Sequence, residues 1–278
     1  EPYRRQRQMC IRDRIILTIA CASTVTLAIR NTANTIVKSY EKSHDLIATI
    51  SFDRGQLENV CYRYQDAPKD SYVFKNINYD FEEGKMYAIK GKSGSGKTTL
   101  LNMIGLIDKP DSGSILVEDR NILAYGKKDC LRYRREMIGM VFQFFQLIPV
   151  LTCRDNIMIA NECVKKCKKD YFDTLTEQLD IKDLLNKYPD QLSGGQQQRI
   201  AIARALINQP RIILADEPTG NLDSENSRRV IDLLKQTTNE YGMTLLMVTH
   251  DADIAKQANH CIHLVDGRIP VSYTHLRA

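Results

Sequence analysis

Short apolar segments alternate with charged stretches from about residue 57 to residue 269. Residues 57–64 (LENVCYRY) and 114–122 (SILVEDRNI) show the apolar–polar alternation that is typical of a strand. Continuously apolar runs indicate buried strands, and helical segments follow them. This order predicts a parallel sheet with helices on both faces. The apolar runs are 85–90 (KMYAIK), 211–216 (RIILAD) and 244–250 (TLLMVTH), and the predicted helices are 98–107, 197–207 and most of 126–192.

A separate apolar segment, residues 15–29 (IILTIACASTVTLAI), carries no charge. It is shorter than the roughly 18 residues that mark a complete membrane span. We expect it to be the last part of a truncated transmembrane helix of a permease, with residues 30–54 as its polar flank. A buried core helix and the remnant of a signal peptide are the alternatives.

Both ends of the chain read as translated foreign DNA. The DNA that encodes MCIRD (9–13), read on the opposite strand, encodes VSYTH (271–275), so one element in two orientations accounts for both. This element resembles a transposase adapter from sequencing libraries. We therefore expect residues 1–14 and 270–278 to be adapter-derived and exclude them from the fold argument. The alternative is a disordered basic tail with an unrelated C-terminus.

The composition is that of a globular protein, with 43% hydrophobic and 26% charged residues in a chain of 278. It excludes a low-complexity or disordered chain. The net charge of +5 includes +3 from residues 1–14 and +1 from residues 270–278, which leaves +1 for the remainder. A nearly neutral remainder gives no support for a nucleic-acid partner. The cysteines lack regular spacing, which indicates a reducing compartment rather than a disulfide framework.

A glycine-rich loop follows the apolar run 85–90 and precedes a predicted helix. It fits the phosphate-loop pattern G-x-x-x-x-G-K-S/T. Glycines let the backbone approach phosphate oxygens, and N–H groups at the helix N-terminus face the anion. Lys97 supplies a positive charge at the β- and γ-phosphates, and the Thr98 hydroxyl is a ligand for Mg²⁺. The predicted nucleotide-binding residues here are Gly91, Ser93, Gly94, Ser95, Gly96, Lys97, Thr98 and Thr99.

Two carboxylates stand at the end of the apolar run 211–216. Asp216 stands at the tip of that predicted strand, where a carboxylate holds Mg²⁺ directly or through water. Glu217 comes next, and a second carboxylate at this position accepts a proton from an attacking water. A pair of solvated loop acids is the alternative, which the nearby phosphate loop disfavours.

A second anion site is predicted at Ser193, Gly194, Gly195 and Gln196, which precede the helix over 197–207. A serine hydroxyl, bare glycine backbone and a helix N-terminus together suit a phosphate group. With Leu192 these residues read LSGGQ, and here the sequence closely resembles the ATP-binding cassette (ABC) family. In that family the motif binds the γ-phosphate of the ATP that the other subunit holds.

The remaining family motifs follow in the family's order. Gln143 in VFQ matches the glutamine that senses Mg²⁺ and contacts the transmembrane partner, and Asp223 in GNLD matches an aspartate that lies across the dimer. His250 in MVTH matches the histidine that touches the γ-phosphate. Tyr64 matches the aromatic residue that stacks on adenine, with a structural role in its strand as the alternative.

Two runs narrow the resemblance to the MacB/LolD/FtsE-type ATPases. They are residues 134–152 (RREMIGMVFQFFQLIPVLT) and 206–223 (LINQPRIILADEPTGNLD). These ATPases energise transporters that extract or export lipoproteins, peptides or drugs, and one branch acts in cell division. The resemblance covers about residues 57–269. It departs from the pattern where Asp119-Arg120 replaces the usual Asp-Gly turn.

The resemblance implies an α/β P-loop NTPase fold. Its parts are a RecA-like parallel sheet core, an antiparallel β subdomain and a helical subdomain that carries the signature. We expect this ABC nucleotide-binding domain over residues 55–269. MacB-type fusions place the ATPase before the membrane helices, whereas residues 15–54 precede it here, which indicates an assembly chimera or a rearranged fusion.

The implied function is that of an ATP-binding and ATP-hydrolysing subunit of an ABC transporter. It would use Mg²⁺, form an ATP-sandwich dimer with a second ATPase subunit, and sit at the cytoplasmic face of the cell membrane on an FtsX/MacB-type permease. A non-transporting regulatory ATPase of the cell-division type is the main alternative, and an ATPase of DNA repair or translation is a distant one. The implied catalytic residues are Glu217, His250, Gln143 and Lys97, and the implied metal ligands are Thr98, Gln143 and Asp216.

Overall fold

The structure is a computed structural model that describes residues 54–63, 72–162, 164, 167, 169–269 and 272–274. The segment expected to be adapter-derived at the start, the expected membrane segment and its flank up to residue 53, and Tyr64 lie outside the described residues. No helix in the described part of the chain is long and apolar enough to cross a membrane.

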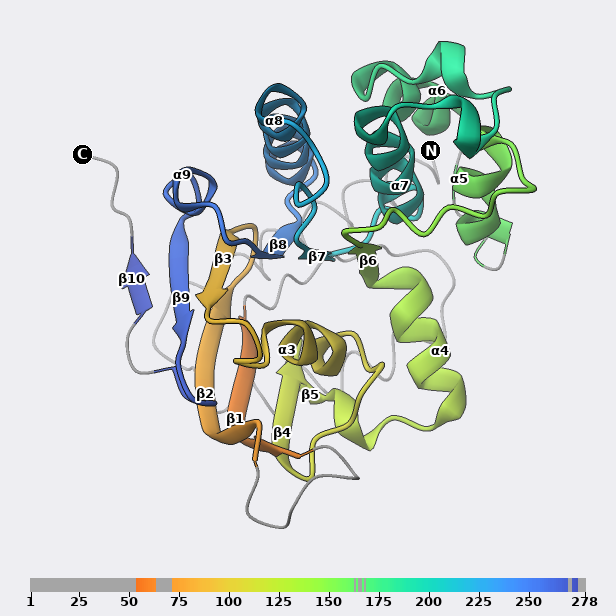
Figure 1. The fold of residues 1–278 in the computed structure, drawn as a ribbon. Helices are drawn as coiled ribbons and strands as arrows, with labels where there is room; N and C mark the ends of the chain where they lie inside the picture. Colours follow the sequence, from red (N-terminus) through yellow and green to blue (C-terminus); the bar gives the residue numbers. More distant parts are fainter. Residues whose placement is uncertain are drawn as a thin grey trace, which may run out of the picture. The chain divides into compact units, whose positions relative to one another are not determined.

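A six-stranded sheet has the strand order β10-β9-β3-β8-β7-β6 (Figure 1). Its neighbouring strands are parallel, except that β10 is antiparallel to β9. The three apolar runs predicted as buried strands become β3, β7 and β8, whereas β6 and β9 have no counterpart among the expected strands. The strands are β3 (Met86–Gly91), β6 (Ile138–Val141), β7 (Ile212–Asp216), β8 (Thr244–Val248), β9 (His260–Leu264) and β10 (Ser272–Thr274).

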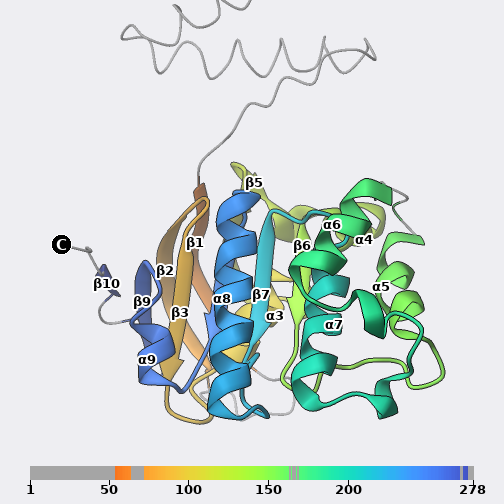
Figure 2. The same cartoon turned by 90° about the horizontal axis from the view of Figure 1, so that it is seen from above.

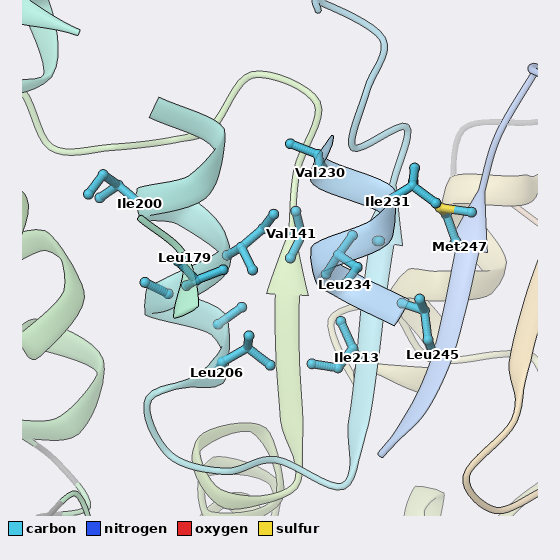
Figure 3. Packing of buried hydrophobic residues seen from close by; sticks show 14 of the residues in the cluster. Val141, Leu179, Ile200, Leu206, Ile213, Val230, Ile231, Leu234, Leu245 and Met247 are labelled. Atoms are coloured by element: carbon cyan, nitrogen blue, oxygen red, sulfur yellow. The ribbon is translucent and has the colours of Figure 1, made fainter. Parts of the chain in front are cut away.

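The parallel sheet is buried on both faces, and its side chains alternate between two hydrophobic clusters. Leu245 and Met247 of β8 belong to one cluster, whereas Leu246 and Val248 belong to the other. A strand covered on both sides needs an apolar residue at every position, which explains the continuous apolar run. Figure 3 shows the first cluster, in which helices α7 (Gly194–Leu206) and α8 (Ser224–Glu240) cover the sheet. Its labelled members are Val141, Leu179, Ile200, Leu206, Ile213, Val230, Ile231, Leu234, Leu245 and Met247.

A second, antiparallel sheet has the order β2-β1-β4-β5. Helix α3 (Lys97–Ile104) lies between the two sheets, because Leu100 and Met103 share a cluster with Leu57 and Ile115 of the antiparallel sheet and with Leu214 of the parallel sheet. The phosphate loop ahead of α3 is therefore held between two layers of strands. These strands are β1 (Arg54–Tyr62), β2 (Phe74–Glu82), β4 (Ser112–Val117) and β5 (Arg120–Asn121).

A mostly helical region connects β5 to β7, as the pattern over 126–192 predicts. Figure 2 shows α4, α5, α6 and α7 gathered beside the edge strand β6. The interruption by β6 was not expected, since its four residues are too short to show a strand period. The elements of this region are η1 (Ile122–Ala124), α4 (Lys127–Glu136), α5 (Cys153–Glu162), α6 (Lys169–Gln178), η2 (Lys182–Leu184) and η3 (Pro189–Gln191), and α9 (Ala252–Ala255) lies after β8.

The turn between β4 and β5 differs from the expectation for residues 118–120. Val117 pairs with Arg120, so the two turn residues are Glu118 and Asp119, one position earlier than the Asp119-Arg120 turn expected from the family. Both have positive φ, 52° and 58°, the combination that a two-residue hairpin turn of this hand requires. The run expected as one strand over 114–122 is therefore two strands joined by a tight turn.

Candidate nucleotide site

The site is built at one edge of the parallel sheet. β3, β8, β7 and β6 are neighbours in that order and run parallel, so their carboxyl ends meet at one edge. Gly91 ends β3 and opens the phosphate loop, and Asp216 ends β7. His250 follows β8 by two residues and Gln143 follows β6 by two. Residues far apart in the sequence thus converge because their strands are adjacent.

The phosphate loop turns sharply into α3. Gly96 caps the helix with φ 95° and no side chain caps its N-terminus, and Gly94 also has positive φ, 77°. A Cβ on Gly96 would lie 2.7 Å from the Phe74 ring and from the Val73 side chain. Glycine is thus required at residue 96 by both backbone conformation and space. The first turn of α3 contains no acidic residue, so its N–H groups present an uncompensated positive end.

Lys97 and Ser95 fit a phosphate group. The Lys97 side chain is buried, and its Nζ donates hydrogen bonds to the carbonyls of Gly91 (3.0 Å) and Lys92 (2.9 Å). The Ser95 hydroxyl is buried and has no hydrogen-bond partner among the described residues. An ammonium group, an orphaned hydroxyl and an uncapped helix N-terminus are groups that a bound phosphate would satisfy. Ser93 is exposed and Thr99 is buried in the same loop.

Thr98 and Asp216 are joined directly across the site. The Thr98 hydroxyl donates to Oδ2 of Asp216 at 2.9 Å. Burial raises the pKa of the Asp216 carboxyl, and the hydrogen bond from Thr98 partly opposes that shift. A hydroxyl and a carboxylate oxygen placed side by side form a hard donor set that suits a divalent cation.

Glu217 and His250 form a pair in which the His250 Nε2 lies 2.7 Å from Oε1 of Glu217. The Glu217 backbone has φ 46°, and its N–H donates to the Val248 carbonyl at 3.1 Å. Such a conformation is strained for a residue with a side chain and is typical of functional positions. A carboxylate and an imidazole in contact make this pair a candidate for proton transfer.

Gln143 is held against the loop that follows Glu217. A Cβ on Gly220 would lie 2.8 Å from the Gln143 Nε2, so a larger residue at position 220 would displace the Gln143 side chain. The Asn221 side chain donates to the Gln143 carbonyl at 2.9 Å. Asn221 was not among the predicted site residues, although it stands inside the GNLD run that carries Asp223.

The signature turn begins α7 and is tied to the start of α8. Ser193 and Gln196 cap each other's backbone N–H groups reciprocally. A Cβ on Gly195 would lie 2.8 Å from Oδ1 of Asn226, while Asp223 caps α8 by accepting from the Asn226 N–H at 2.9 Å. Hydrogen bonds from Asn226 lower the pKa of the exposed Asp223 carboxyl. The sole signal for Asn226 in the sequence is its position three residues after an aspartate that can cap a helix.

The signature turn and the phosphate loop are not joined within the chain. Among the hydrogen bonds and ion pairs of the described residues, none links residues 193–196 with residues 91–98. Helices α3 and α7 pack on opposite faces of the parallel sheet (Figure 1). The predicted residues therefore form two groups, one around the phosphate loop and one around the signature.

The protein-family profile described as "ABC transporter" matches residues 74–220. This stretch contains the phosphate loop, the signature turn and the two carboxylates Asp216 and Glu217 at the end of β7. The chain belongs to the ABC transporter family. As an ABC ATPase it binds and hydrolyses ATP, and its two sheets and helical region are those of a P-loop NTPase.

Curated relatives of this ABC ATPase extend beyond the profile. An uncharacterized ABC transporter ATP-binding protein of Mycobacterium tuberculosis is 40% identical over 217 residues, which cover 77% of this chain and 88% of the relative. The lipoprotein-releasing system ATP-binding protein LolD of Leptospira interrogans is 41% identical over 202 residues, covering 72% of this chain and 85% of LolD.

Solved structures support the same assignment. An ATP-binding cassette of Methanocaldococcus jannaschii, solved as a dimer in a post-hydrolysis state with ADP and Pi, matches with a TM-score of 0.73 and 37% identity. That match covers 81% of this chain and all of the cassette. The chain is therefore the ATP-binding subunit of an ABC transporter.

Proposed function

We propose that this ABC ATPase powers an FtsX/MacB-type permease that exports or extracts lipoprotein, peptide or drug. The runs 134–152 and 206–223 and the similarity to LolD proteins support this transporter group. The subunit would lie at the cytoplasmic face of the membrane as a peripheral partner of the permease. The loop after Gln143 supports a docking role, because Phe144 and Val150 leave 73% and 80% of their surfaces exposed.

Hydrolysis rests on the convergence of four side chains at one sheet edge. Thr98 at the start of α3 contacts Asp216 at the end of β7. Glu217 contacts His250, and these two residues follow the adjacent strands β7 and β8. We assign the β- and γ-phosphates of ATP to the phosphate loop, where Lys97 and the N–H groups of α3 oppose their charge. Tyr64 would stack on adenine.

Mg²⁺ fits the oxygen-rich corner of this site. Thr98, Asp216 and Gln143 would hold it through a hydroxyl, a carboxylate and an amide oxygen. When bound, the ion neutralises charge that develops on the phosphate oxygens during transfer. The raised pKa of Asp216 reflects a carboxylate held partly out of water, and a cation beside it would favour its ionised form.

Glu217 would act as the general base toward the attacking water. Its Oε1 would accept the water proton while the water attacks the γ-phosphorus in line and the bond from that phosphorus to the bridging oxygen of ADP breaks. His250 lies 2.7 Å from the same oxygen and would orient the carboxylate, in addition to contacting the γ-phosphate. The hydrogen bond to Val248 fixes the backbone of Glu217, so the base has little freedom to move away.

The separation of the two groups of site residues supports a dimer. In this arrangement Ser193, Gly194, Gly195 and Gln196 of one subunit complete the phosphate loop of a second ATPase subunit, and Asp223 lies at the same junction. Each subunit then supplies half of two sites, so ATP acts as the link between subunits. Hydrolysis would loosen that link and move the region around Gln143 against the permease.

The direct test of the base is Glu217→Gln, which keeps size and hydrogen bonding but removes the proton acceptor. We expect ATP binding to persist and turnover to fall by about 10²–10⁴-fold, measured by phosphate release and by nucleotide affinity. Glu225→Gln, on the exposed first turn of α8, should leave turnover unchanged. Normal turnover in Glu217→Gln would overturn the assignment.

A further inference from the structure

A cavity opens between the two sheets, at the edge of the parallel sheet opposite the nucleotide site. It is lined by Ile212 and Thr244, the first residues of β7 and β8, whereas Asp216 and His250 lie at or after the far ends of these strands. Helix α3, which begins at the phosphate loop, reaches the cavity through its last residue, Ile104. Figure 1 shows α3 with the strands of both sheets around it. The other apolar lining residues include Leu57, Phe81, Ile115, Val117 and Leu246, all members of the hydrophobic cluster between the two sheets.

The hollow exists because Gly55 carries no side chain. Its cross-strand partners are Phe81 on β2 and Val117 on β4, and both line the cavity. Directly opposite residues in a sheet point to the same face, so this row of three lacks its central side chain. The φ of Gly55 is not positive, and a Cβ there would lie 3.7 Å from the Phe81 Cβ, its nearest neighbour. Neither the backbone nor the available space therefore requires glycine at this position.

The inner part of the cavity is narrow and apolar. Its volume is about 60 Å³, which is smaller than the roughly 150 Å³ of an engineered apolar cavity that binds benzene. The space therefore suits a short alkyl chain better than a ring. The Thr244 hydroxyl already accepts from the Gly84 N–H at 3.0 Å. Among the described residues, no buried side-chain atom without a hydrogen-bond partner lines this cavity, so no polar group there calls for an ordered water.

Charged residues that reach the solvent line the mouth, and carboxylates outnumber cations among them. Glu118 forms an ion pair with Arg211. Glu82 lies 3.9 Å from the His260 Nε2, but burial lowers the pKa of His260, which keeps that ring neutral at neutral pH. Among the described residues, no basic nitrogen lies within 4.0 Å of the Glu83 carboxylate. Three carboxylates and one guanidinium thus leave the mouth negatively charged.

We propose that this cavity binds a small alkylammonium ion. The alkyl chain fills the space over Gly55, and the ammonium group lies at the mouth beside Glu83, with Glu82 and Glu118 nearby. The apolar walls accept any short alkyl chain, whereas the surplus of carboxylates selects a cationic head group. Neither the permease nor the assignment of the catalytic base enters this proposal, which goes beyond the proposed function.

The test uses the full chain and three ligands of equal chain length: pentylammonium, 1-pentanol and pentanoate. Titrations followed by saturation-transfer NMR give the three Kd values at neutral pH. Pentylammonium should bind at least about threefold more tightly than 1-pentanol, and pentanoate should bind most weakly. Added salt should reduce the preference for the cation, because the mouth is exposed to solvent. Saturating ADP should change none of the three Kd values, since the nucleotide lies at the opposite edge of the sheet.

Two variants with matched controls locate the binding. Gly55→Val fills the hollow and should abolish binding of all three ligands. Gly126→Val adds the same side chain ahead of α4, where φ is −71° and a Cβ would meet only Asp129 at 3.8 Å, and should leave binding intact. Glu83→Gln should weaken pentylammonium without affecting 1-pentanol. Glu58→Gln, at an exposed position of β1 that does not line the cavity, should affect neither ligand.

Three results would overturn the proposal. The hollow would be a mere packing defect if pentylammonium showed no saturable binding, and the site would lie elsewhere if binding survived Gly55→Val. Pentanoate binding as tight as that of pentylammonium would indicate selection by Arg211 and contradict the cationic head group. Loss of pentylammonium binding on addition of ADP would place the amine at the nucleotide site. If Gly55→Val does not fold, Gly55→Ala decides, because its single methyl group should weaken binding at least about threefold and unchanged binding would count against the cavity.

Discussion

At the scale of a single residue, burial and the proposed cation binding have opposite effects on the ionisation of the Asp216 carboxyl. Its place at the end of a buried strand removes water from the carboxylate, which raises its pKa. The proposed binding of Mg²⁺ would require the same carboxylate in its ionised form. The Thr98 hydroxyl compensates for part of the lost hydration. In the nucleotide-free chain, the charge of the partly buried Asp216 carboxylate therefore lowers the free energy of unfolding.

Because the charged Asp216 destabilises the nucleotide-free fold, Asp216→Asn should stabilise it. The same change should reduce Mg²⁺-dependent hydrolysis. An acid whose pKa is raised by folding destabilises the fold above that pKa, and the penalty disappears as pH falls below the unfolded value of about 4. We expect a higher Tm for the variant at pH about 7 and little difference near pH about 4, by thermal unfolding. A lower Tm at neutral pH would contradict this reasoning.

The turn between β4 and β5 offers a second test at residue scale. Asp119 holds φ 58° in a two-residue hairpin turn, where glycine is favoured at the second position. Asp119→Gly should raise the free energy of unfolding by roughly 0.5–1 kcal/mol, measured by urea titration. Asp129→Gly, in the first turn of α4, should lower it by a similar amount. Equal effects of the two changes would show that the turn is not strained.

At the scale of elements, one buried asparagine shapes the loop that leads into α5. Asn156 is fully buried and accepts from the Ile148 N–H at 2.7 Å. Its Nδ2 donates to the carbonyls of Ile148, Leu151 and Thr152. The side chain replaces the backbone pairing that a strand or helix would supply. It thereby fixes the loop that displays Val150.

Asn156→Ala should therefore destabilise the chain by about 1–3 kcal/mol, because several partly buried backbone groups lose their partner at once. Asn186→Ala, at an exposed position, should change stability by less than about 0.5 kcal/mol. Urea unfolding of both variants measures the difference. A small effect of Asn156→Ala would mean that water takes over these hydrogen bonds.

Elements with strong local patterns could be predicted from the sequence, and elements that depend on distant pairing could not. The apolar run 211–216 became β7, because a strand buried on both faces must be apolar throughout. β6 has four residues and exists through its pairing with β7, so its own sequence carries little signal. The run 114–122 alternates correctly, yet contains a turn without glycine or asparagine at its centre.

In the candidate site, too, features that depend on a local motif could be predicted from the sequence, and contacts between distant elements could not. Motifs predict the phosphate loop, both carboxylates and the signature because their chemistry depends on local spacing. Spacing along the chain does not reveal contacts between different elements. Two such contacts are those of Asn226 with Gly195 and of Gln143 with Gly220. The direct pairing of His250 with Glu217 arises because β7 and β8 are neighbours.

At the scale of the whole molecule, the two groups of site residues predict complementation between inactive variants. Lys97→Ala damages the phosphate loop and Ser193→Arg damages the signature turn, so each pure dimer lacks competent sites. Random mixing places one variant of each kind in half of the dimers, and each mixed dimer contains one intact site. Activity should recover to about a quarter of the unaltered level, measured by phosphate release after mixing. No recovery would indicate that each chain forms a complete site alone.

The segment from Glu217 to Asn226 is anchored at several points along its length. Glu217 bonds to β8, Gly220 packs on Gln143, and Asn226 packs on Gly195 under the Asp223 cap. Adding or removing one residue would break at least one of these contacts. Related proteins should therefore differ in the amino acids of this segment but not in its length. Insertions should instead occur in surface loops elsewhere. In a library of in-frame insertions, the segment from Glu217 to Asn226 should be among the parts of the chain that tolerate an added residue least.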